Sequence, residues 1–328
     1  VNGSFKIADY TSTEPEDQLC RKEEVVKVGS IVIPVFFALL VVFSCIGNLL
    51  VLAILVLCEK FRSLINILIL NLAVSDLLFT FGLPFWASYY IWGWTFGEVG
   101  CKAVKFFFYV GFYSSVLFLT VMTVQRYMAV VHPLSDWERC RCFSVAPFIV
   151  WILSGTAALL ISLRSQVLEQ EGVLYCEFDS IQVKHAAVYL QNVFFLIAFC
   201  IMGFCQVRMF QTIAQSRTKW RHKAIKLIFC IGLVFFMGWA PYNILMFLRI
   251  LQDYGLSSFI DCNVSIRLDY AFYACRLLAF SHCCLNPVLY ALVGEKFQKH
   301  LQTILKKMFT QFEGKVTCVQ YGTVYVCS

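Results

Sequence analysis

Asp76 is the one acidic residue deep inside an apolar segment, in the run Asn71-Leu-Ala-Val-Ser-Asp76. A carboxylate at such a depth is costly unless it is paired or hydrated. Without a basic neighbour it could bind a cation such as sodium, with Asn48, Ser115 and Asn286 as further ligands if their segments converge. The alternative, which carries equal weight, is a polar cluster that joins helices without an ion.

The five histidines do not form a catalytic or metal-binding arrangement. They are scattered along the chain, and the sequence contains no zinc-ligand spacing, phosphate-binding loop or nucleophile elbow. We therefore expect a protein without enzymatic activity. The polar residues are better interpreted as binding or structural positions.

The composition indicates a chain that is embedded in lipid. Of 328 residues, 60% are hydrophobic and only 14% are charged, whereas about a quarter are charged in an ordinary soluble domain. A helix needs about 20 apolar residues to cross a bilayer. The sequence therefore predicts an all-α membrane protein, a seven-transmembrane helix bundle, with crossings at 29–57, 64–92, 99–131, 143–164, 185–214, 223–251 and 267–292.

Basic residues in the short connections predict the orientation. Arg217, Lys219 and Arg221 lie between the fifth and sixth segments, and Arg139 and Arg141 lie between the third and fourth. We expect these connections to face the cytoplasm, with the amino terminus outside and the carboxyl terminus inside. The net charge of +7 then reflects the cytoplasmic face and its contact with anionic lipid, and gives no reason to expect nucleic acid as a partner.

The chain is interpreted as one bundle with flanking segments. Residues 1–28 form an acidic extracellular tail, 29–292 the bundle, and 310–328 a cytoplasmic tail. Between the last two, apolar residues at helical spacing with lysines opposite predict a short amphipathic eighth helix at 294–309, lying on the inner leaflet. Glycosylation sequons begin at Asn2 and Asn263 on the outside.

Four of the sixteen cysteines fall in segments expected outside, where disulfides persist. They are Cys20, Cys101, Cys176 and Cys262, and three pairings are possible. We favour Cys101 with Cys176, which would hold the second extracellular loop across the mouth of the bundle. Cys20 with Cys262 would tie the tail to the far rim. The remaining alternative is unpaired thiols.

Six short motifs occur in order along the predicted helices: Gly47-Asn48, Leu72 to Asp76, Arg126-Tyr127, Trp151, Trp239-Ala-Pro241 and Asn286-Pro287-Val-Leu-Tyr290. Each is weak alone. Together, and with Cys101 and Cys176, they resemble the signature of the rhodopsin-like G-protein-coupled receptors. The resemblance covers about residues 20–310 and implies a receptor in the plasma membrane.

Further motifs resemble the chemokine receptors within that class: Leu83-Pro84-Phe85-Trp86, Trp94-Thr-Phe96-Gly97 and His132-Pro-Leu. The stretches 216–229, 239–243 and 275–286 are most similar to the XC type, which binds lymphotactin-like chemokines. Arg276 stands where many chemokine receptors are expected to have a glutamate, so its site should favour a different ligand amino terminus. The resemblance implies an extracellular chemokine as the ligand and chemotaxis as the response.

An acidic tail would attract a basic chemokine through complementary charge. Tyr10, beside Asp9, is a candidate for sulfation that would add to this charge; the alternative is an acidic tail without a specific role. Aromatic residues at helical spacing more often pack inside a bundle than contact a ligand, so family position favours Trp86 and Arg276 most. The candidate ligand-binding residues are Tyr10, Trp86, Lys105, Tyr109, Tyr242, Arg249, Asp269 and Arg276.

The resemblance also implies signalling through a heterotrimeric G protein, expected to be of the inhibitory type, with arrestin as a further candidate partner. Trp239 above the Pro241 kink resembles the family's pivot, and Arg126 would hold the inner helix ends together in the inactive state. The candidate activation and G-protein residues are Asp76, Arg126, Tyr127, Phe235, Trp239, Pro241, Asn286, Pro287 and Tyr290.

Gln125 and Gln206 are among the residues that depart from the family pattern, with Gly82, Ala198 and Gly238. Gln125 precedes Arg126 where an aspartate is usual, and Gln206 stands where a tyrosine is usual. The first change predicts higher basal activity or a scavenger receptor, and we favour signalling because the XC type tolerates a non-acidic residue there. Another peptide ligand is a further alternative. A transporter or channel is the alternative from a different class, because such proteins also place kinked helices around polar sites.

Overall fold

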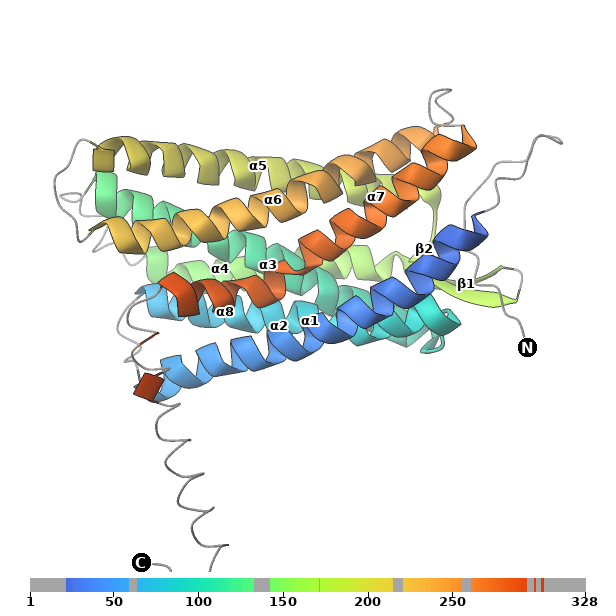
Figure 1. The fold of residues 1–328 in the computed structure, drawn as a ribbon, viewed down its shortest axis with the longest axis horizontal. Coiled ribbons are helices and arrows are strands. Elements are labelled where there is room, and N and C mark those ends of the chain that lie inside the picture. Colours follow the sequence, from blue (N-terminus) through green and yellow to red (C-terminus); the bar gives the residue numbers. More distant parts are fainter. Residues whose placement is uncertain are drawn as a thin grey trace, which may run out of the picture.

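The structure is a bundle of long helices that lie side by side, with a β-hairpin at one end (Figure 1). The computed structural model describes residues 22–58, 64–132, 142–170, 172–214, 221–254 and 261–293, together with residues 298, 302 and 303. In chain order the elements are α1 (Glu23–Cys58), α2 (Leu64–Trp92), α3 (Gly97–Val131), α4 (Cys142–Leu163), β1 (Ser165–Gln170), β2 (Val173–Phe178), α5 (Ile181–Ala214), α6 (Arg221–Asp253), α7 (Cys262–Phe280) and α8 (His282–Val293).

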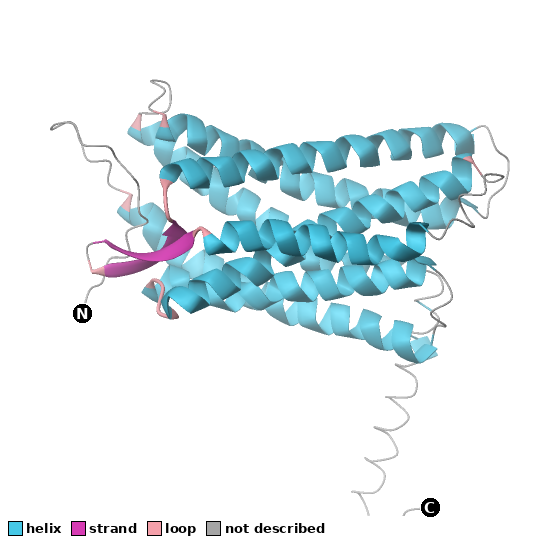
Figure 2. Cartoon of the chain, turned by 180° about the vertical axis from the view of Figure 1, so that it is seen from behind, coloured by secondary structure: helices cyan, strands magenta, loops and turns pink. Residues whose placement is uncertain are grey.

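The two ends of the bundle differ. The strands β1 and β2 and the first residues of α1 lie at one end, which we call the hairpin end. The helices α3 and α8 finish at the opposite end. Figure 2 shows the same arrangement from behind, with the hairpin in magenta.

Seven crossings make up the bundle. Six helices, α1 to α6, are each long and apolar enough to cross a membrane. The shorter helices α7 and α8 follow one another with a bend at Ser281, so together they form the seventh crossing that the sequence predicts at 267–292 (Figure 1). Large apolar side chains such as Ile46, Phe148 and Phe210 stay exposed on the outer faces, which suits a lipid surrounding. The predicted seven-transmembrane bundle is confirmed.

The boundaries differ most from the predictions at the hairpin end. The helix α1 begins at Glu23 rather than at residue 29, so the tail predicted at 1–28 overlaps it, and α7 begins at Cys262 rather than at 267. In α1, Glu23 and Glu24 favour a helix amino terminus but lower the local hydropathy from which its start was predicted. In α7, the Asp261 side chain caps the helix by accepting a hydrogen bond from the Asn263 backbone N–H. Of the predicted helix 294–309, only 298, 302 and 303 are described, and they are helical.

Pro287 lies inside α8, beyond the bend at Ser281, and has no backbone N–H to donate. The carbonyl of Cys283, four residues earlier, therefore lacks its helical partner. Asn48 Nδ2 and Ser44 Oγ of α1 donate to that carbonyl instead, at 2.8 and 3.2 Å. Gly47 makes this contact possible, because a Cβ atom there would lie 2.8 Å from Pro287 Cβ.

The hairpin is held across its end of the bundle by covalent and hydrogen bonds. The strands pair antiparallel, with Val167 opposite Cys176. Cys176 forms a disulfide with Cys101 of α3, the pairing that we favoured from the sequence. The Trp94 N–H also donates to the Leu174 carbonyl at 2.8 Å. Cys262 is disulfide-bonded too, whereas its predicted partner Cys20 lies outside the described residues.

The helices α2 and α3 approach each other closely at Gly111, which is buried. A Cβ atom at this position would lie 2.4 Å from the Phe79 backbone nitrogen and 2.7 Å from its Cα. Backbone atoms cannot move aside as a flexible side chain can. The contact therefore depends on the absence of a side chain at residue 111.

We expect Gly111→Ala to lower the stability of the purified receptor by about 1–3 kcal/mol, the usual cost of overpacking a core. Thermal unfolding in detergent, followed by the exposure of buried cysteines, would measure the change. Gly155→Ala in α4 is the matched control, because a Cβ atom there meets nothing within 4 Å. Equal melting temperatures for the two variants would contradict the close approach of α2 and α3.

Candidate functional site

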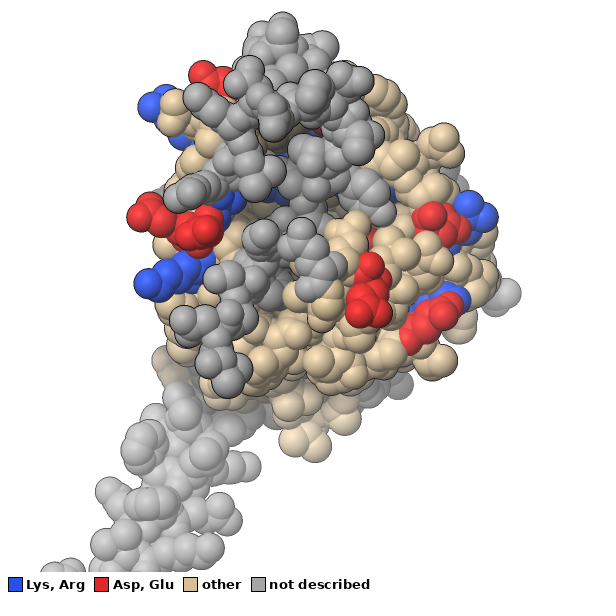
Figure 3. Space-filling model, turned by 90° about the vertical axis from the view of Figure 1, so that its right-hand side faces the viewer, with Lys and Arg blue, Asp and Glu red and all other residues tan. Residues whose placement is uncertain are grey.

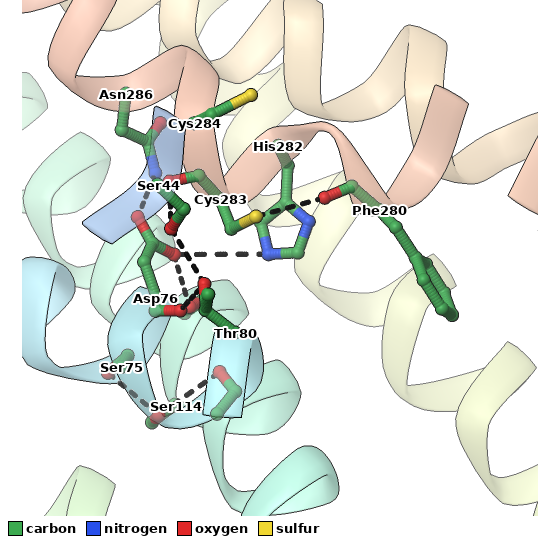
Figure 4. Close-up of polar contacts among 12 residues, drawn as sticks. Ser44, Ser75, Asp76, Thr80, Ser114, Phe280, His282, Cys283, Cys284 and Asn286 are labelled. Atoms are coloured by element: carbon green, nitrogen blue, oxygen red, sulfur yellow. Dashed lines mark hydrogen bonds and ion pairs between the residues drawn. The ribbon is translucent and has the colours of Figure 1, made fainter. Parts of the chain in front are cut away.

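The Asp76 carboxylate is fully buried and joins three helices (Figure 4). Its Oδ1 accepts a hydrogen bond from Ser115 Oγ of α3 at 2.9 Å, and its Oδ2 accepts one from Asn286 Nδ2 of α8 at 2.8 Å. Three of the four predicted cation ligands therefore meet. Each carboxylate oxygen of Asp76 therefore has a hydrogen-bond donor within the described network.

Asn48, the fourth predicted ligand, has no hydrogen bond to the Asp76 carboxylate. Its Nδ2 donates instead to the Cys283 carbonyl and, at 3.0 Å, to the Ser44 backbone carbonyl. The connection to Asp76 is indirect: Ser44 Oγ lies 2.6 Å from Thr80 Oγ1, which donates to the Asp76 backbone carbonyl at 2.6 Å. Asn48 is thus a link between α1 and α8 rather than a neighbour of the carboxylate.

His282 is a member of this cluster that sequence reasoning missed. Its Nε2 lies 3.9 Å from Asp76 Oδ1 and its Nδ1 lies 2.9 Å from the Ala279 carbonyl (Figure 4). Because a carbonyl only accepts, the proton of a neutral ring stands on Nδ1. The signal in the sequence was its position four residues before Asn286, which places both on one helix face.

Trp239 of α6 stacks above this cluster in a group of aromatic rings. Its ring centroid lies 4.4 Å from that of Phe112, 5.9 Å from Phe235 and 5.3 Å from the His282 imidazole. On the side of the hairpin end, Tyr242 follows at 5.6 Å. These separations lie in the range of favourable aromatic contacts. Trp239 therefore contacts both the Asp76 cluster and the residues nearer the hairpin.

Arg276 of α7 is the centre of a second group, toward the hairpin end. It donates a hydrogen bond from Nη1 to Tyr90 Oη, and its guanidinium lies 4.5 Å from the Phe272 ring centroid. Arg249 of α6 lies over the same ring at 3.9 Å and pairs with Asp269. Tyr242 stacks on Phe272 at 5.5 Å. Four predicted ligand-binding residues are thus brought together around Phe272: Tyr242, Arg249, Asp269 and Arg276.

Three further predicted ligand-binding residues, Trp86, Lys105 and Tyr109, lie on α2 and α3. The Trp86 ring packs 6.3 Å from Phe108, and Tyr109 packs 5.6 Å from Phe108. Lys105 is buried, with its Nζ 4.1 Å from the centroid of Phe178 in β2. Phe280, which is 5.3 Å from Phe108 and 5.9 Å from the Arg276 guanidinium, joins this group to the first. Tyr10 lies outside the described residues.

The comparisons with known proteins agree with this arrangement. A model of the seven-transmembrane receptors of the rhodopsin family matches residues 47–290. Human chemokine XC receptor 1 is 41% identical over 277 residues, 84% of this chain and 81% of the relative. The mouse XC receptor 1 is 39% identical over 84% of this chain and 83% of the relative, and human C-C chemokine receptor type 8 is 36% identical over 93% and 87%. The chain belongs to the chemokine-receptor family.

At the opposite end of this chemokine receptor, several polar side chains in or near the family motifs have no hydrogen-bond partner among the described residues. Arg126 Nε and Gln125 Oε1 are buried without hydrogen-bond partners, and Arg126 forms no ion pair among the described residues. Tyr127 Oη lies 3.1 Å from His132 Nε2. Gln206 Nε2 is likewise buried and unpartnered. Tyr290 belongs to α8, but its side chain lies outside the described part of the structure.

Other members of the family motifs have packing roles in this receptor. Trp151 Nε1 of α4 donates to Asn71 Oδ1 of α2 at 2.8 Å. Trp94 Nε1 donates to the Gly97 carbonyl at 2.8 Å, which closes the turn between α2 and α3. Asn263, a predicted glycosylation site, is exposed, whereas Asn2 lies outside the described residues. The relatives are receptors, and this chain shares their fold and motifs.

We expect Asn48→Ala to lower stability by about 1–3 kcal/mol, the cost of weakening the bonds of a buried polar group. The change removes the amide that satisfies the Cys283 carbonyl where Pro287 interrupts the helix. Thermal unfolding in detergent would measure it. Asn192→Ala is the matched control, since that amide donates only to Val188 within its own helix. A loss no larger than in the control would count against the link between α1 and α8.

Proposed function

We propose that this protein is a plasma-membrane receptor for a lymphotactin-like chemokine of the XC type, and that it signals through a G protein of the inhibitory type. The observation that carries the proposal is a continuous series of contacts from Arg276 to Asp76. It runs through Phe272, Tyr242, Trp239 and His282, with steps of 4.5, 5.5, 5.6, 5.3 and 3.9 Å.

This series supports a receptor because it joins a site at one end to a polar cluster in the middle of the bundle. A ligand changes a receptor by binding two arrangements of the helices with different affinity. Phe272 and Arg276 lie on α7, Tyr242 and Trp239 on α6, and His282 on α8. A ligand that displaces Arg276 would therefore press directly on the rings that pack α6 against α7 and α8.

The hairpin end is proposed to face the outside of the cell. It holds the disulfide between Cys101 and Cys176 and the disulfide-bonded Cys262, and such bonds persist in oxidising surroundings. The connections at the other end carry the basic residues between α3 and α4 and between α5 and α6, as on cytoplasmic loops. The acidic tail before α1 would then meet a basic chemokine.

The opposite end supports coupling to a G protein. Arg126 lies in the last turns of α3 with its Nε unpartnered and with Gln125 in place of an acidic neighbour. Without a local carboxylate, fewer bonds must break before the arginine contacts a partner. We therefore expect basal signalling above that of a receptor with an aspartate at residue 125, and Gln125→Asp to lower it.

The test measures cAMP in cells that express the full chain, before and after a lymphotactin-type chemokine, with a binding assay beside it. We expect the chemokine to reduce cAMP accumulation in the wild type and Arg126→Ala to abolish the reduction while surface binding remains. Arg208→Ala is the matched control at the same end, because its side chain is exposed and contacts only Gln211 in the described network. The control should respond as the wild type does.

A scavenger receptor is the second candidate, and the unpaired Arg126 beside Gln125 is the observation that favours it. Binding and internalisation of the chemokine without any reduction in cAMP would establish that function and contradict G-protein signalling. Absence of binding would reject the lymphotactin-like ligand and direct the search to other chemokines or peptides.

We also propose that the Asp76 cluster binds a sodium ion. The cluster offers the carboxylate of Asp76, the hydroxyl of Ser115 and the amide oxygen of Asn286, and oxygen ligands suit hard cations. A bound ion would connect α2, α3 and α8 and so stabilise the arrangement of the helices in the receptor without chemokine.

Arrestin is a further proposed partner, on the ground of family membership alone.

Replacing potassium chloride by sodium chloride at constant ionic strength should raise the melting temperature of the wild type and weaken chemokine binding. Asp76→Asn should remove both effects, because it removes the carboxylate that would bind the cation. Asp253→Asn, which alters a carboxylate at the hairpin end, should keep them. A sodium response that survives in Asp76→Asn would leave the cluster as a link between helices without an ion.

A further inference from the structure

The charges around Phe272 are not balanced among the described residues. Asp269 is shared by two cations: it pairs with Arg249 of α6 and lies 3.1 Å from Lys22 Nζ at the start of α1. Arg276 has no carboxylate partner in this part of the structure. Its Nη1 donates to Tyr90, Tyr242 is a second side-chain hydrogen-bond partner, and its Nε is buried without an acceptor. Tyrosine hydroxyls are neutral, so neither bond supplies a negative charge.

A second cation lies on the other side of the group. Lys105 of α3 is only 4% exposed, and its ammonium lies against Phe178 rather than against an anion. Glu177, the neighbour of Phe178 in β2, attracts Lys105 electrostatically but forms no direct ion pair with it. The charge of Lys105 is thus partly offset, and Arg276 is left as the least compensated cation.

Aromatic rings only partly repay the burial of such a charge. A cation over a ring gains about 0.5–2 kcal/mol, whereas burying an ion costs several kcal/mol unless it is paired and hydrogen-bonded. A partner that supplies an anion to Arg276 would gain a strong, charge-assisted hydrogen bond at little further desolvation cost. A partner that supplies an ammonium group would find Asp269 already shared by Arg249 and Lys22. The other carboxylate of the group, Glu177, already acts on the buried Lys105.

We propose that Arg276, with Lys105 as a second cation, receives a carboxylate side chain from the segment of the protein ligand that enters the hairpin end. The inference rests on the proposed function, since it assumes that a chemokine inserts its amino-terminal segment there. It adds the chemical class of the contact: an Asp or Glu of the ligand, and not its terminal amine, is the anchor. The planar guanidinium can bind both carboxylate oxygens through its unpartnered Nε and the adjacent Nη, which the carboxylate would take from a tyrosine hydroxyl.

This contact would also explain how a ligand acts on the bundle. Arg276 donates a hydrogen bond to Tyr90 of α2, and its guanidinium lies over the Phe272 ring. Phe272 in turn stacks on Tyr242. A ligand carboxylate would compete for the donors of Arg276 and draw its guanidinium from these rings. The first step in the series of contacts toward Trp239 would then change on binding.

The test uses a lymphotactin-type chemokine in which a single Glu or a single Gln is placed, in turn, at each position before its first cysteine. Binding is measured on cells that express the full receptor. At one position we expect the Glu probe to bind wild type at least roughly tenfold more tightly than the Gln probe, as for a hydrogen-bonded charge pair. Arg276→Gln should remove that preference, and Arg276→Glu should favour a Lys probe instead.

Two further variants make the result specific. Arg164→Gln is the matched control, because this arginine is 58% exposed and pairs with Asp179 at 2.8 Å near the hairpin; the preference for Glu should persist. Figure 3, which looks onto this end, shows such basic and acidic side chains side by side at its edge. Arg276→Lys keeps the charge, so it should retain part of the preference even if Arg276→Gln disturbs the Tyr90 contact and lowers surface expression.

The outcomes separate the two proposals. If no lymphotactin-type probe binds wild type, the proposed function is wrong. If probes bind but Glu and Gln are equivalent at every position, or if the preference for Glu survives in Arg276→Gln, the anionic anchor is wrong while the function stands. A preference that appears only after the acidic residues of the receptor's own tail are changed to amides would assign Arg276 to that tail and would also overturn the proposal.

Discussion

The carbonyl of Cys283 is the point on which the inner half of the bundle depends. Pro287 takes away its helical partner, and lipid offers no water to replace it. Asn48 and Ser44 of α1 supply the missing donors, which fixes the bend of the seventh crossing against α1. Because the bend positions the residues that follow, Asn286 can reach Asp76 from α8.

The same bend connects the polar centre to the aromatic layer above it. His282 stands at the first residue of α8, with one ring nitrogen toward the Ala279 carbonyl and the other toward Asp76. Its ring also contacts Trp239 and Phe235 of α6. Polar and aromatic contacts are therefore made by one side chain, so a displacement of the aromatic layer changes the surroundings of the buried carboxylate.

The hairpin end is held together by a different set of contacts. There the disulfide of Cys101 and the hydrogen bond of Trp94 to β2 hold the hairpin in place, and cations are stabilised by aromatic rings and by a shared carboxylate. Such an arrangement is incomplete as a charge network and well suited to a partner that brings an anion. Rigid surroundings and an unsatisfied donor are the two conditions under which a ligand gains most from one polar contact.

The sequence alone determined the class of this protein. The seven crossings followed from the length of the apolar segments, because an apolar helix of that length satisfies its own backbone hydrogen bonds across a bilayer. Motifs such as Trp239-Ala-Pro241 identified the family. Proximity between distant residues was decided only by the tertiary structure. Asn48 was predicted beside Asp76 but donates to the Cys283 carbonyl, and His282 was missed. Hydrogen bonds between crossings depend on helix rotation and on the bend at Ser281, and neither can be derived from hydropathy or spacing.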